Sequence, residues 1–162
     1  QFLQEQRREP GEARITTVLF NHKRETLYTT LPLPPAPDMN RNTWRPTGQT
    51  ALLDAIGYVL HDQSDRIRQE GWAEKVIVCI LTDGQENASR YFSNISLAAL
   101  IHDQEAAGWS FVFLAANQDA FSTARAMGMS EDHVMNYETA GGGTHEAFLQ
   151  MGFTTSRLRR RH

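Results

Sequence analysis

The feature that most constrains the fold is an apolar run that ends in an acidic residue. Residues 76–82 are Val-Ile-Val-Cys-Ile-Leu-Thr, and Asp83-Gly84 follows directly. A run of this kind is typical of a strand buried on both faces of a parallel sheet. Ligands of open α/β sheets bind beyond the carboxyl ends of the strands, so Asp83 is a candidate binding residue. The alternative is that Asp83 and Gly84 form only a sharp turn, a common role for both residue types.

Strand and helix patterns alternate in the second half of the chain. Alternation of this kind predicts parallel strands joined by right-handed crossovers, which is the α/β class. We expect helices at 93–108, at 119–127 and from 144 onward, with strands at 109–115 and 133–137. Ser93 or Ser96 is the expected N-cap of the first of these helices, and Thr144 that of the last.

The first half of the chain begins with the end of a helix and a predicted hairpin. Residues 14–20 and 24–31 are rich in β-branched and apolar residues, and the three-residue gap between them suits an antiparallel hairpin at a sheet edge. Residues 32–46 hold five of the six prolines and predict a long loop, a kind of segment that is often functional. Apolar residues then recur at helical spacing from Leu52 to Leu60.

Length and composition exclude several classes of protein. The 162 residues suit one domain, and the net charge of -3 gives no reason to expect a nucleic-acid partner. The basic segment 157–162 is interpreted as a solvated helix end. Cys79 is the only cysteine, which rules out a disulfide framework and a thiolate metal cluster. No apolar run approaches the ~20 residues that cross a bilayer, so we expect no membrane association.

Thr50 stands just before the helix that carries Leu52, where a threonine is usually an N-cap. Its pairing with Asp83 offers a second interpretation. A hydroxyl from one loop and a carboxylate from the end of a strand are hard oxygen ligands, which suit Mg²⁺, Mn²⁺ or Ca²⁺. Both interpretations of Thr50 stay open at this point.

The two motifs together resemble the von Willebrand factor A (VWA) domain. They are Gly48-Gln49-Thr50-x-Leu52 and, about thirty residues later, the strand end Leu81-Thr82-Asp83-Gly84-Gln85. The resemblance implies a doubly wound, mostly parallel sheet with helices on both faces and one antiparallel edge strand. It also implies a metal-ion-dependent adhesion site at the top of the sheet, with Thr50 and Asp83 among the metal ligands. The implied function is non-enzymatic. A divalent cation, Mg²⁺ or else Mn²⁺ or Ca²⁺, binds an acidic residue of a protein partner.

The chain departs from the family in lacking the Asp-x-Ser-x-Ser motif of that site. The strand that carries this motif would lie between the strands at 14–20 and 76–82. We therefore expect 1–162 to be a single VWA-like domain that is incomplete at its N-terminal side, with further metal ligands outside these residues. Another chain could instead supply the strand, as in a strand-swapped oligomer. Without such a strand, a gap of ~10 Å and unpaired backbone groups costing ~1–3 kcal/mol each predict an unstable monomer.

Two other functions remain open. One is a degenerate VWA scaffold that binds partners without a metal. The other is a Mg²⁺-dependent hydrolase or phosphotransferase in which Asp83 is a nucleophile or a metal ligand, although no second acid follows Asp83 at short spacing before Glu86. His22 and Asn117 follow two other predicted strands and are expected on the same face as Asp83. The chain most resembles intracellular bacterial and phage VWA domains, for which a cytoplasmic location is expected.

Overall fold

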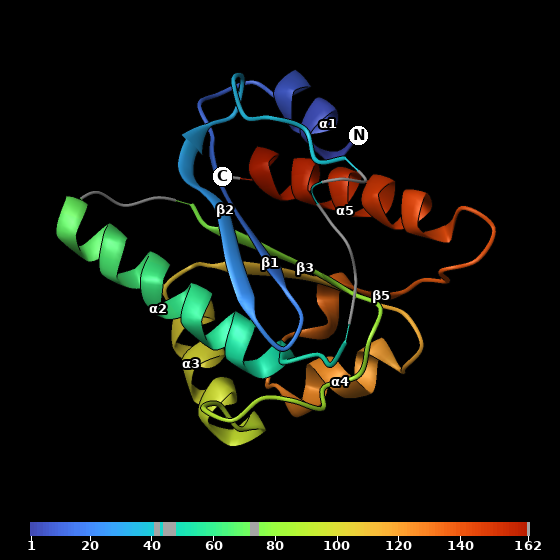
Figure 1. Ribbon diagram of the computed structural model, residues 1–162. Helices are drawn as coiled ribbons and strands as arrows, with labels where there is room; N and C mark the ends of the chain where they lie inside the picture. Colours follow the sequence, from blue (N-terminus) through green and yellow to red (C-terminus); the bar gives the residue numbers. More distant parts are fainter. Residues whose placement is uncertain (41–42, 44–47, 72–74, 162) are drawn as a thin grey trace.

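The computed structural model describes residues 1–40, 43, 48–71 and 75–161 (Figure 1). The predicted loop 32–46 lies partly outside these residues. None of the helices described here is long and apolar enough to span a bilayer. Within the described residues the elements are, in chain order, α1 (Phe2–Arg8), β1 (Arg14–Phe20), β2 (Arg24–Pro32), α2 (Leu52–Glu70), β3 (Ile77–Thr82), α3 (Asn94–Ala106), β4 (Ser110–Ala115), α4 (Ala120–Ala126), a 3-10 turn (Glu131–His133), β5 (Val134–Asn136) and α5 (Gly143–Arg160).

The strands form two separate ladders. β1 and β2 pair antiparallel as a hairpin, and β3, β4 and β5 form a parallel sheet in that order. The predicted α/β class and the parallel pairing in the second half are confirmed. The antiparallel strand, however, does not lie at the edge of one continuous sheet, because β1 shares no ladder with β3.

β1 and β3 nevertheless end at the same side of the molecule. The Ala51 amide donates to the carbonyl of Asn21, which follows β1, at 2.8 Å. The adjacent residue, Thr50, lies against Gly84, which follows β3. One short segment therefore contacts the carboxyl ends of both strands.

The amino ends of β1 and β3 are tied together in the same way, by the last turns of α5. Arg159 donates to the carbonyl of Gly11, before β1, at 3.4 Å. Lys75, before β3, donates to the carbonyl of Leu158. The two strands therefore run in the same direction although no backbone hydrogen bonds join them.

One edge of β3 has no ladder partner among the residues that the structure describes. The carbonyls of Val76 and Thr82 both accept hydrogen bonds from the β4 side, at 3.0 Å each. Alternate residues of a strand direct their backbone groups to opposite sides. The groups of Ile77, Cys79 and Leu81 therefore point away from β4, and these three residues are called the open edge of β3.

The open edge explains why one prediction from the sequence was wrong. β3 was expected to be buried on both faces, yet Ile80 is its only fully buried apolar residue, and Val78 and the open-edge residues are half-buried. In contrast, β4 has partners on both sides and is buried from Phe111 to Ala115. The exposure of β3 follows from the missing neighbour, not from its own composition.

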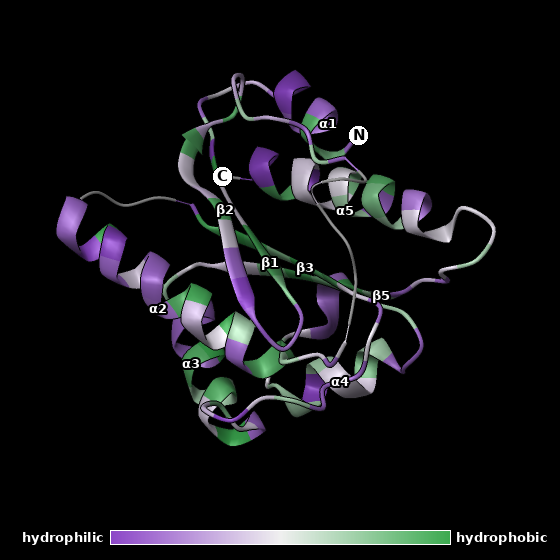
Figure 2. Cartoon of the chain, viewed as in Figure 1, coloured by the Kyte–Doolittle hydropathy of each residue, from purple (hydrophilic) through white to green (hydrophobic). Residues whose placement is uncertain are grey.

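Helices cover both faces of the parallel sheet (Figure 1). Apolar side chains of α2, α3 and α4 pack on one face, and those of α5 pack on the other. Figure 2 shows apolar colour along β3 and mixed apolar and polar colour along α2 and α5. The largest fully buried side chains are Phe113, Leu52, Leu60, Leu97, Ile101, Leu114, Met127 and Val112.

Two of the predicted helix caps can be compared directly with the structure. Ser93 and Ser96 form a capping box at the start of α3, as the serine pattern predicted. Thr144 was expected to cap α5, but Gly142 occupies the N-cap position with φ 85° and no side chain caps the helix. Gly142 can adopt this left-handed conformation because it has no Cβ.

Candidate functional site

Asp83 follows β3 at the carboxyl end of the parallel sheet, and the loop after β4 fixes its backbone. The Asn117 side-chain amide donates to the Asp83 carbonyl at 2.8 Å. The neighbouring Gln118 amide donates to the Gly84 carbonyl, also at 2.8 Å. Asn117 itself has φ 61°, a left-handed conformation that asparagine tolerates better than most residues. The backbone of Asp83 and Gly84 is thus held by two side chains of the loop that follows the adjacent strand, β4.

The Thr50 hydroxyl lies directly against the backbone of Gly84. A Cβ added to Gly84 would come within 2.5 Å of Thr50 Oγ1, a distance that real contacts do not reach. The φ of Gly84 lies outside the left-handed region. Gly84 was expected to permit a sharp turn, but the structure shows that glycine is needed here for the close approach of Thr50.

Thr50 does not cap α2, so the capping interpretation of this residue was wrong. Ala51 occupies the N-cap position and no cap bond comes from its side chain. The first-turn amides are satisfied instead by the loop after β3. Glu86 accepts from the Leu53 amide and Ser89 accepts from the Asp54 amide, both at 3.0 Å. The Thr50 hydroxyl is therefore not needed for helix formation.

Thr50 is clamped through its backbone. Its amide donates to the Asn87 side chain at 2.8 Å, and its carbonyl accepts from the Asn87 amide at 3.0 Å. Among the described residues, neither the Thr50 hydroxyl nor the Asp83 carboxylate has a hydrogen-bond or ion-pair partner. Two side-chain oxygens from different segments thus lie at one end of the sheet without a partner among the described residues.

The negative charge of Asp83 also acts on Tyr137, the residue that follows β5. Burial raises the pKa of the Tyr137 hydroxyl to about 12, and the negative charge of Asp83 contributes to the same shift. Tyr137 therefore stays protonated at neutral pH. A protonated phenol can donate a hydrogen bond to an anionic group on this side of the site.

His22 and Asn117 both lie at this end of the sheets, as the sequence predicted. The His22 ring approaches Gly48, where an added Cβ would be 3.3 Å from His22 Nδ1. The sequence did not reveal the roles of Asn87 and Gln118. Asn87 three residues after Gly84 is a recognisable turn residue, but its contact with Thr50 depends on tertiary structure.

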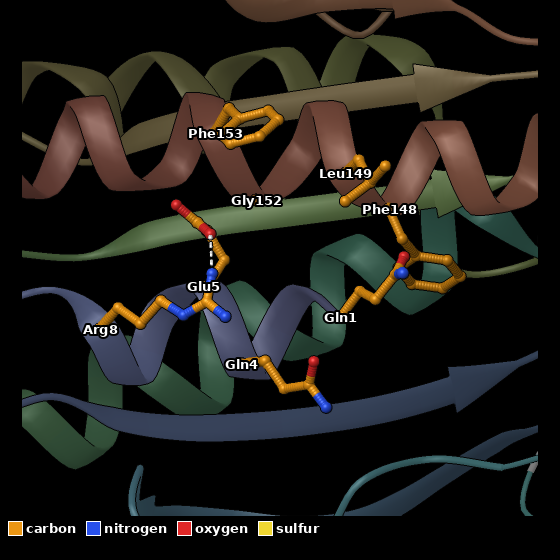
Figure 3. Close-up of a pocket in the computed structure, with 8 residues that line it drawn as sticks. All are labelled: Gln1, Gln4, Glu5, Arg8, Phe148, Leu149, Gly152 and Phe153. Atoms are coloured by element: carbon orange, nitrogen blue, oxygen red, sulfur yellow. Dashed lines mark ion pairs between the residues drawn. The ribbon is translucent and has the colours of Figure 1, made fainter.

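The described residues contain no group of three or more His, Cys, Asp or Glu side chains that could hold a metal ion. A groove of about 190 Å³ lies elsewhere, between α1 and α5 (Figure 3). Its apolar side is formed by Phe148, Leu149 and Phe153, and the Glu5–Arg8 ion pair at 3.7 Å lies along α1. Neither Thr50 nor Asp83 lines this groove.

Comparison with known proteins gives no relative for this chain. No family model matches it, and no curated protein or solved structure matches it either.

Proposed function

We propose that this chain is a VWA-like protein-binding module that uses a divalent cation. Thr50 and Asp83 would supply two of the cation's oxygen ligands, and an acidic residue of the partner would supply another. The observation that carries the proposal is the position of these two oxygens, because the Thr50 hydroxyl lies against Gly84, the residue directly after Asp83. They come from separate segments, lie at the carboxyl end of a parallel sheet and have no partner among the described residues.

The chemistry of the two groups fits a hard cation. Hydroxyl and carboxylate oxygens suit Mg²⁺, Mn²⁺ or Ca²⁺, whereas softer metals prefer thiolate or imidazole. An anionic carboxylate beside a half-buried hydroxyl would be stabilised by a cation between them. The close fit of Thr50 on Gly84 also makes sense in this proposal, because it fixes the hydroxyl relative to Asp83.

Two protein oxygens do not complete the coordination shell. Mg²⁺ takes six ligands and Ca²⁺ six to eight. Water, the partner and ligands outside these 162 residues would complete it. Bound in this way, the cation would supply a positive charge that attracts the carboxylate of a partner. The proposal is one of binding, and no residue is assigned a catalytic role.

The same proposal accounts for the two separate ladders. β1 and β3 run in the same direction, are tied at both ends and each have one unpaired edge. A strand between them would join the hairpin and the parallel sheet into one doubly wound sheet with β2 as its antiparallel edge. We propose that a segment outside residues 1–162, or a strand from another chain, occupies that place.

Isothermal titration calorimetry with Mg²⁺ and with Mn²⁺ tests the cation. The full-length natural protein should bind, Asp83→Ala should bind at least about tenfold more weakly, and Thr50→Ser should keep most of the affinity because it keeps the hydroxyl. Asp103→Ala, an exposed aspartate on α3, is the matched control. Equal binding by wild type and Asp83→Ala would refute the proposed role of Asp83. No binding by the wild type would favour a scaffold that acts without metal.

A further inference from the structure

The loop that leaves the candidate site is held rigidly by a buried aspartate. Asp54, on α2, is 8% exposed. Its carboxylate accepts backbone hydrogen bonds from Arg90, Tyr91 and Phe92 at 2.8, 3.0 and 2.8 Å. Three charge-assisted bonds to consecutive amides fix the second half of the loop.

A second carboxylate fixes the first half. Glu86 accepts from the amides of Ala88 and Ser89 at 3.1 and 2.7 Å, and from the Ser89 hydroxyl at 2.8 Å. The same carboxylate accepts from the Leu53 amide at 3.0 Å, which ties the loop to the start of α2. A surface held in one conformation loses little entropy when it binds a partner.

This rigid loop presents large side chains to solvent. Tyr91 is 74% exposed, and Ile95, in the first turn of α3, is 85% exposed. The Tyr91 ring lies edge-on to Tyr58, with 6.1 Å between ring centroids, and the Arg24 guanidinium lies over Tyr58 at 4.1 Å. These contacts join Arg24, Tyr58 and Tyr91, while the exposed Arg90 precedes Tyr91 in the chain and Ile95 follows it by four residues. The five residues are called the aromatic-basic patch.

The charge of the patch calls for an anionic partner. Within the described residues, neither Arg24 nor Arg90 forms an ion pair with a carboxylate. Nucleic acid is disfavoured, because the exposed acid Asp62 lies on the same helix as Tyr58. Asp62 follows Tyr58 by one helical turn and therefore lies beside it on α2. An acid at this position repels the many closely spaced charges of a phosphate backbone more strongly than a single carboxylate.

We propose that the aromatic-basic patch binds a protein segment that presents a carboxylate beside an apolar side chain. The arginines would pair with the carboxylate, and Tyr91 and Ile95 would cover the apolar group. Tyrosine and arginine are enriched among the residues that dominate binding energy at interfaces. This inference rests on the proposed function, because the patch would be the second contact of the partner that the cation anchors. One loop connects the two surfaces, since it carries both Asn87, which bonds to Thr50, and Tyr91.

Selection of random peptides displayed on phage, with the full-length natural protein as bait, tests the proposal. We expect enriched peptides to share an Asp or Glu next to a large apolar residue. Synthetic versions should bind Tyr91→Ala about tenfold or more weakly than wild type and should bind Arg90→Ala more weakly as well. Tyr91→Phe should retain most of the binding. Phe153→Ala, which removes a 51% exposed aromatic from α5, is the matched control and should bind as wild type does.

Repeating the measurements with Mg²⁺ and with a chelator separates this inference from the proposed function. Binding that needs Tyr91 but persists in chelator supports the patch and contradicts the cation. Binding that needs Mg²⁺ and Asp83 but is unchanged by Tyr91→Ala supports the cation and overturns the patch. Enrichment of peptides without acidic residues, or of none at all, also overturns the patch.

Discussion

Replacing Asp54 by alanine should release residues 90–92, the second half of the loop, and destabilise the protein substantially. The variant removes the acceptor of three backbone hydrogen bonds, from Arg90, Tyr91 and Phe92. Hydrogen bonds to charged groups contribute about 1.5–3 kcal/mol each. The three are not additive, because the freed amides of a surface loop can turn to water. We therefore expect a loss of about 3 kcal/mol, or a fall in Tm of about 6–12 °C for a domain of this size.

Hydrogen exchange measured by mass spectrometry, together with a thermal melt, provides the assay in the full-length natural protein. The amides of residues 90–92 should exchange much faster in Asp54→Ala, whereas those of β4 should change little. Asp54→Asn should have an exchange rate at 90–92 and a Tm between those of wild type and Asp54→Ala, because its side-chain amide oxygen can still accept hydrogen bonds. Asp65→Ala is the matched control, since Asp65 is an exposed aspartate on the same helix whose partner is Arg68 at 3.2 Å. Unchanged exchange at 90–92, or a Tm within about 1 °C of wild type, would refute the reasoning.

Three further changes follow from the contacts described above. Gly84→Ala should displace the Thr50 hydroxyl and lower the free energy of unfolding by about 0.5–1.5 kcal/mol. It should also weaken Mg²⁺ binding about tenfold. Calorimetry that shows wild-type affinity for Mg²⁺ would contradict this prediction. Arg160 donates a hydrogen bond to Glu9 and holds the pKa of that carboxyl below its ordinary value of 4.5. Ionised Glu9 therefore stabilises the fold above pH 4.5. This stabilisation is lost as the pH falls through the lower pKa of Glu9 in the folded state. Thermal melts should therefore show Glu9→Gln to be less stable than wild type at neutral pH, with the difference closing in acid, and a difference that does not change with pH would exclude this linkage. If no added strand pairs with β3, the open-edge amides of Ile77, Cys79 and Leu81 should exchange with solvent faster, as measured by NMR, than the amides of Val78 and Ile80. Equal protection of the two sets would indicate that another strand pairs with the open edge.

The elements that depend on local pattern were predictable from the sequence. β1 and β4 lie within a residue of the expected ranges, and the serine pattern of residues 93 and 96 correctly predicted the cap of α3. Hydrophobic periodicity and capping depend on residues close together in the chain, so they can be recognised from the sequence alone. Thr50 contacts Gly84, the residue directly after Asp83, and the metal-binding role of Thr50 and Asp83 stays a prediction.

The errors concern contacts between segments distant in the sequence. Thr50 has the usual N-cap position by sequence, but Glu86 and Ser89 arrive from another loop and satisfy the helix instead. β3 has the composition of a central strand, yet its exposure depends on the absence of a neighbour on one side. The sequence pattern near Thr50 or along β3 does not predict these contacts, because each depends on which distant segments meet in the folded protein.

The position of the cation is the most direct test of the central claim. Mn²⁺ broadens the NMR signals of nearby amides, so a titration of the full-length natural protein locates the bound ion. The proposal predicts that broadening begins at Thr50, Asp83 and Gly84 and that Asp83→Ala abolishes it there. Broadening spread over the exposed acids of α2 and α3, with none at Asp83, would contradict a cation site formed by Thr50 and Asp83.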